Sequence, residues 1–217
     1  METNTGFSLL KLFVMGGPLM WPLLLFSIAA VAITLERMIY FIYHNLKIDD
    51  LKQTIEAAIK EGKLPGTMEY LEGLTRRRMG ARVLLTLVQR SGLSEYRLEK
   101  AIEAEALNCI SSLENGLNFL TALGSIAPLT GFLGTVTGMI GAFKSIAEAV
   151  DVNAQIVASG IYEALITTVF GLCIAIVAMF SHSLFTHQVD RFASGVEVAC
   201  SDLIIALAES RGDKNED

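Results

Sequence analysis

Residues 160–181 read GIYEALITTVFGLCIAIVAMFS, and this stretch is the most informative part of the sequence. It is long enough to cross a bilayer as a helix, which takes about 20 apolar residues, yet it contains one carboxyl group, Glu163. The nearest preceding charge, Asp151, would lie about 18 Å away along a helix axis, so Glu163 is expected within the hydrocarbon layer. A charge there costs about 2.5–3.5 kcal/mol on insertion scales, so such residues usually mark ion or proton pathways. The alternative is a protonated or hydrogen-bonded glutamate that only holds helices together.

The composition predicts a membrane protein. The 217 residues are 52% hydrophobic and only 18% charged, and the mean hydropathy of +0.49 is too high for an ordinary soluble domain. Residues 19–43, 115–143 and 153–185 each reach spanning length. The first of them is too long for the apolar core of a signal peptide and leads directly into Glu36 and Arg37. No strand-like alternation is present, so we predict an all-α integral membrane protein with three transmembrane helices.

The basic residues predict how the chain is oriented. Most of them lie between the first and second spans, and more follow the third span. The positive-inside rule therefore places residues 44–114, a helical loop, and residues 186–217, a helix with a disordered tail, in the cytoplasm. Residues 1–18 and the short link 144–152 are expected outside. The basic residues of the loop are Lys47, Lys52, Lys60, Lys63, Arg76, Arg77, Arg78, Arg82, Arg90, Arg97 and Lys100.

Two of the three spans are expected to extend as long helices into the cytoplasm. Val189, Phe192 and Val196 continue a stripe of helical spacing beyond the third span. Ahead of the second span, Leu98 and Ile102 begin a similar pattern that reaches residue 115 without a strong break.

The second span carries small residues at helical spacing. Residues 127–143 read APLTGFLGTVTGMIGAF, and small residues on one face let membrane helices approach closely. Pro128 is expected to bend this helix because it removes a backbone donor. A nucleotide-binding loop is excluded, because no glycine directly precedes a Lys-Ser or Lys-Thr pair. The residues assigned to helix packing are Pro128, Gly131, Gly134, Gly138 and Gly171.

Threonines accompany the glutamate. Glu163, Thr167 and Gly171 form one stripe at intervals of four residues, and Thr168 lies beside it. Thr135 and Thr137 are polar residues within the glycine-rich segment. Their hydroxyls could hydrogen-bond water or stabilise a carboxylate along a hydrated path, or could bond a carbonyl one turn earlier, as is common in membrane helices. For Thr168 both interpretations stay open.

The segments GFLGTVTGMIGAF (131–143) and GIYEALITTVFGL (160–172) together resemble the MotA/TolQ/ExbB family of proton-channel subunits. The resemblance is specific over about residues 120–180, and three spans look more like ExbB or TolQ than like MotA-type stators, which have four. It implies that Glu163, Thr168 and Thr135 line the proton path, with Thr167 and Thr137 as further pore-lining candidates. Some relatives carry a bulky aromatic at the position of Thr137.

The resemblance also implies partners and a location. It implies a homo-oligomer, a pentamer, around a central pore that holds a single-span subunit like ExbD or TolR, whose membrane-embedded aspartate relays protons. The proton motive force would then energise a TonB- or TolA-like transducer of an envelope process such as outer-membrane transport. The chain would be a multi-pass protein of the bacterial inner membrane, with a periplasmic N-terminus and a cytoplasmic C-terminus.

Other functional classes find less support. His44, His182 and His187 do not cluster with cysteines or carboxylates at metal-ligand spacing, so no enzyme, metal or cofactor is expected. No nucleic-acid partner is expected. The three cysteines show no CxxC spacing and predict no disulfide framework. A small-molecule transporter would be expected to show more spans or internal repeats. A non-conducting membrane scaffold and a stator for surface motility remain as alternatives.

Overall fold

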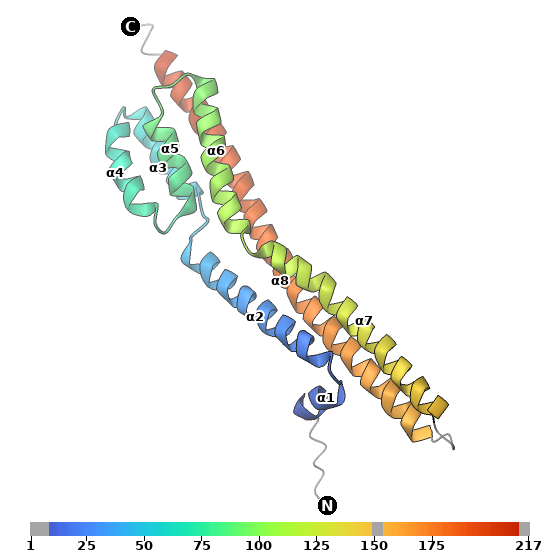
Figure 1. The fold of residues 1–217 in the computed structure, drawn as a ribbon. Helices are drawn as coiled ribbons and strands as arrows, with labels where there is room; N and C mark the ends of the chain where they lie inside the picture. Colours follow the sequence, from blue (N-terminus) through green and yellow to red (C-terminus); the bar gives the residue numbers. More distant parts are fainter. Residues whose placement is uncertain (1–8, 149–153, 213–217) are drawn as a thin grey trace, which may run out of the picture. The chain divides into compact units, whose positions relative to one another are not determined.

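The computed structural model describes residues 9–148 and 154–212, and every regular element within those ranges is a helix (Figure 1). The all-α prediction is therefore confirmed for the described residues. Three stretches are long and apolar enough to cross a membrane, Met20–Tyr43, Glu95–Glu148 and Ala158–Ser210, which confirms three long apolar helices. The first residues of the expected outer segment, residues 149–152 of the expected link after the second span and the last residues of the expected disordered tail lie outside the described residues.

The helices fall into two compact units. The first unit contains α1, α2 as far as Glu36, α7 and the part of α8 that ends at Ser183. The second unit contains the end of α2, helices α3 to α6 and the remainder of α8. The helices are α1 (Leu9–Met15), α2 (Met20–Tyr43), α3 (Asp49–Lys60), α4 (Leu64–Leu74), α5 (Met79–Gln89), α6 (Glu95–Glu114), α7 (Leu117–Glu148) and α8 (Ala154–Gly212).

The first unit is built around the antiparallel pair α7 and α8. Gly138 near the end of α7 faces Ala164 early in α8, and Gly124 near the start of α7 faces Met179 further along α8. α7 continues through Pro128 without ending. Large apolar side chains such as Phe132 remain exposed on this unit, as expected for helices that face lipid.

The helix that was expected to continue from residue 95 into the second span is interrupted at the start of that span. α6 ends at Glu114 and α7 begins at Leu117, because Gly116 between them adopts φ +84°. That left-handed conformation is accessible to glycine at little cost and interrupts a helix. α8, by contrast, runs without interruption for 59 residues.

The second unit is a helical bundle held by an apolar core and by ion pairs between helices. Arg78, ahead of α5, donates two hydrogen bonds to the Asp50 carboxylate of α3, over 2.6 and 2.8 Å. This pairing lowers the pKa of Asp50, chiefly through the hydrogen bond from Arg78. Lys52 pairs with Asp202, which ties α3 to α8. The core includes Leu51, Ile55, Leu71, Leu84, Leu87, Val88, Leu98, Leu113, Phe192, Val196 and Leu203.

Candidate functional site

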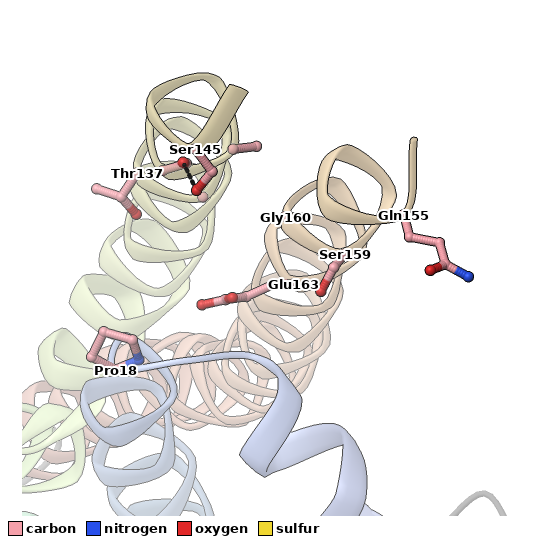
Figure 2. Close-up of a pocket in the computed structure, with 10 residues that line it drawn as sticks. Pro18, Thr137, Ser145, Gln155, Ser159, Gly160 and Glu163 are labelled. Atoms are coloured by element: carbon pink, nitrogen blue, oxygen red, sulfur yellow. Dashed lines mark hydrogen bonds between the residues drawn. The ribbon is translucent and has the colours of Figure 1, made fainter. Parts of the chain in front are cut away.

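A pocket of about 610 Å³ opens in the first unit between the last turns of α7 and the first turns of α8 (Figure 2). Its volume greatly exceeds the ~30 Å³ that a water molecule occupies in the liquid. Hydroxyl, amide and carboxyl groups line it, so it can hold water. Among the described residues of its wall, Glu163 alone carries an ionisable side chain. The wall comprises Pro18, Thr137, Gly138, Gly141, Ala142, Ser145, Gln155, Ser159, Gly160 and Glu163.

Glu163 lies on α8 with its carboxyl group directed into the space between α7 and Pro18 (Figure 2). Gln155, another residue of the wall in the first turn of α8, precedes it by eight residues, a rise of about 12 Å on a helix. The side chain is half-buried. The carboxylate is therefore reached through the pocket from the end of the α7–α8 pair.

The turn between α1 and α2 forms the opposite side of the site. Gly17 has φ +71°, and a Cβ atom built on it would lie 2.0 Å from Oε1 of Glu163. A Cβ atom on Gly16 would lie 3.2 Å from Cγ2 of Ile166, one turn further along α8. The backbone of this turn is thus in direct contact with the face of α8 that presents the glutamate.

The threonines of α7 differ in their surroundings. Thr137 is exposed and shares the pocket wall with Glu163. Its hydroxyl donates hydrogen bonds to the carbonyls of Leu133 at 2.9 Å and Gly134 at 3.2 Å. Thr135 is half-buried, is not part of the pocket wall, and donates to the Phe132 carbonyl at 2.7 Å. Within this chain, the pocket therefore brings Glu163 together with Thr137 and not with Thr135.

The threonines of α8 contact α7 below the pocket. The Thr168 hydroxyl donates to the carbonyl of Gly131 at 3.1 Å. Thr167 is 1% exposed and donates to Gly131 at 3.3 Å and to Ala164 at 2.8 Å. Both hydroxyls thus connect α8 to one carbonyl of α7.

The glycines make this close approach possible. A Cβ atom on Gly131 would lie 2.8 Å from the Thr167 carbonyl oxygen, and one on Gly134 would lie 2.1 Å from the Thr167 hydroxyl oxygen. On the other helix, a Cβ atom on Gly171 would lie 2.6 Å from the carbonyl oxygen of Ala127. Glycine at these positions lets the two backbones touch, which is how small residues act between membrane helices.

Several wall residues had no signal in the sequence. Gly17 and Pro18 are 145 or more positions from Glu163, and only the tertiary structure brings them to it. Ser145 follows the second apolar segment, and Ser159 directly precedes the stretch 160–181. Their positions eighteen and four residues from the glutamate became informative only after the α7–α8 pairing was known.

The remaining polar candidates give no second site. Within residues 9–148 and 154–212, no three His, Cys, Asp or Glu side chains are placed to hold a metal ion. Nδ1 of His44 lies 3.1 Å from the Tyr40 carbonyl, within its own helical turn. Cys109, Cys173 and Cys200 are free thiols.

Comparison with known proteins identifies a family whose sequences this chain matches. Residues 72–198 match the model of the MotA/TolQ/ExbB proton channel family. A protein described as putative biopolymer transport protein ExbB-like 1, from Synechocystis, is 34% identical over 195 residues, which cover 86% of this chain and 75% of the relative.

Two further relatives match over less of their length. Biopolymer transport protein ExbB from Pseudomonas putida is 30% identical over 165 residues, 75% of this chain, and the chain spans about half of that relative (47%). Tol-Pal system protein TolQ from Haemophilus influenzae is 41% identical over 81 residues, which is 37% of this chain and 36% of the relative.

Proposed function

This chain belongs to the MotA/TolQ/ExbB proton channel family, and from that premise we propose that it is a subunit of an inner-membrane motor in which Glu163 accepts and releases protons. The motor would energise a TonB- or TolA-type process of the cell envelope, such as transport across the outer membrane. The observation that carries the proposal is the half-buried carboxyl of Glu163 in the wall of a pocket that also presents hydroxyl and amide groups, between two apolar helices.

The pocket serves as the entry for protons. Thr137, Ser145 and Ser159 supply hydroxyls along its wall, and hydroxyls and water together can conduct a proton to a carboxylate. With the link between α7 and α8 on the periplasmic side, as the positive-inside rule favours, the pocket opens toward the side from which protons flow. The membrane potential contributes about 2.3 kcal/mol per charge per 100 mV.

Thr168 and Thr135 are proposed to continue the path beyond Glu163. Thr168 lies five residues further along α8, a rise of about 7.5 Å. Its hydroxyl donates to the Gly131 carbonyl and would have to exchange this bond for one to water while a proton passes.

One carboxyl group per chain cannot convert proton flow into work without a second group to load and unload. We therefore propose that copies of this chain form a pentamer whose pore holds a single-span subunit like ExbD or TolR. Transient protonation of that subunit's aspartate would change its preferred contacts with the surrounding helices and turn one assembly within the other. The second unit, with its ion-paired bundle, is assigned to the cytoplasm.

The test is proton flux into liposomes that contain the full-length protein and its single-span partner. Glu163→Gln keeps the size of the side chain and removes its titration, so flux should fall at least tenfold while the size of the assembly is unchanged. Glu148→Gln is the matched control, since Glu148 is also acidic, lies in the last turn of α7 and is exposed. Its flux should equal that of the unmodified protein. Full flux in Glu163→Gln would refute the proposal and would favour a non-conducting scaffold.

A further inference from the structure

The backbone of the α1–α2 turn lies directly against the side chain of Glu163, and no other side chain lies between them. The turn is ordered by its own hydrogen bonds: the amide of Gly16 donates to Leu12 at 3.0 Å, and the amide of Met20 donates to Gly17 at 3.2 Å. Gly17 is held at φ +71°, a conformation that residues with a Cβ atom rarely adopt. The next residue, Pro18, is part of the pocket wall.

The contact is with the reactive end of the glutamate. The Cβ position of Gly17 would lie 2.0 Å from Oε1, 3.0 Å from Cδ and 3.6 Å from Cγ of Glu163. Ordinary van der Waals contacts of a Cβ atom begin at about 3.4 Å. There is therefore no room for any side chain at position 17 while the carboxyl group keeps its place.

From this geometry we propose that Gly17 is a positioning residue for Glu163. The turn closes one side of the carboxyl group, so that the group faces the pocket and exchanges protons only there. The part of this inference that concerns proton flux rests on the function proposed above. The positioning itself does not, because it concerns only where the carboxyl group lies.

A methyl group at position 17 should displace the carboxyl group without unfolding the protein. The atom in conflict is the far end of a flexible side chain, which can rotate away from the turn. The left-handed φ adds a cost of its own, which is independent of the glutamate. Gly62 separates the two effects, because it has φ +69° and no atom lies within 4 Å of its Cβ position.

The experiment measures how fast a hydrophobic carbodiimide modifies Glu163 in membranes that contain the full-length protein. Carbodiimides react with protonated carboxyl groups, and mass spectrometry of the peptide gives the rate at each pH. We expect Gly17→Ala to change the rate at least threefold and to displace its pH profile. Gly62→Ala should match the unmodified protein, and Glu163→Gln gives the background. An unchanged profile in Gly17→Ala would overturn the proposal.

A thermodynamic cycle covers the case in which Gly17→Ala assembles poorly. The drop in melting temperature caused by Gly17→Ala should shrink in a Glu163→Ala background to that of Gly62→Ala, because the colliding atoms are gone. Equal drops in both backgrounds would reject the contact. The two proposals can be refuted separately. Proton flux that persists in Glu163→Gln would refute the proton role of Glu163 and would leave the labelling result intact. Unchanged labelling in Gly17→Ala would refute the positioning role of Gly17 alone.

Discussion

The packing of α7 against α8 is tested most directly at Gly171. A Cβ atom there would lie 2.6 Å from the Ala127 carbonyl oxygen and 3.3 Å from Cα of Gly131. All of these are backbone atoms, so no side chain can rotate to make room. The change Gly171→Ala can be accommodated only if the two helices move apart locally by about 0.8 Å, the distance that restores an ordinary contact.

The expected loss of stability follows from the interactions that this movement would break. Overpacking typically costs about 1–3 kcal/mol. The hydrogen bonds from Thr167 and Thr168 to the Gly131 carbonyl are 3.3 and 3.1 Å long, and the movement would lengthen both beyond hydrogen-bonding distance. Each such bond between membrane helices is worth about 0.6 kcal/mol, whereas alanine in place of glycine gains about 1 kcal/mol within a helix. The net loss is about 2 kcal/mol, a melting temperature lower by about 4–8 °C for a chain of this size.

The assay is thermal unfolding of the purified full-length protein in detergent, followed by far-ultraviolet circular dichroism. Gly195→Ala is the matched control, because Gly195 lies within the same helix and its Cβ position has no atom within 4 Å. At position 195 the only expected effect is the gain in helix stability when alanine replaces glycine, so the melting temperature should rise by about 2–4 °C. A melting temperature for Gly171→Ala at or above that of the unmodified protein would show that α7 and α8 do not touch here.

Two further outcomes are expected. Thr168→Val, which keeps the shape and removes the hydroxyl, should lower proton flux severalfold in the liposome assay, whereas Thr168→Ser should retain it; equal flux in both variants would assign this hydroxyl to helix packing. Asp50→Asn should lower the melting temperature at pH 7, and the difference should shrink as the pH falls below about 4. The sign follows from the lowered pKa of Asp50 beside Arg78, since a depressed carboxyl pKa stabilises the fold only while the group is ionised. A difference that is constant down to pH 2 would contradict this account.

The sequence was sufficient for features that depend on composition and on local periodicity. Three long apolar stretches predicted three long helices, because an apolar run of spanning length has few alternatives. The spacing of Gly131, Gly134 and Gly138 indicated one helical face, and the structure places all three against α8. The break at Gly116 was not predicted, although the Asn115–Gly116 dipeptide is a turn signal, because the apolar residues on both sides of it keep helical spacing.

The site itself depends on contacts between distant parts of the chain. Helical spacing and the family motif associate Glu163 only with the threonines that share its helix or that motif. The structure instead places Gly17 against the carboxyl group and lines the same pocket with Pro18 from the first turn and with Thr137 and Ser145 from α7. No local pattern predicts such a wall, because its members share neither spacing nor residue type.

Glu163, Thr167 and Gly171 share one stripe of α8 but lie in two different environments. Glu163 opens to the pocket, whereas Thr167 is buried against Gly134 and Gly171 lies against the backbone of Ala127. Between α7 and α8 there is no space for even one methyl group at these glycines, so a hydrated path cannot continue along this contact. Under the proposed function, a proton that reaches Glu163 would therefore leave outside this contact, and Thr168 would take part only after its hydroxyl had released the Gly131 carbonyl. A surface supplied by a neighbouring subunit or by a polar group of a partner would complete that route, which is the physical reason that the proposed function requires an assembly.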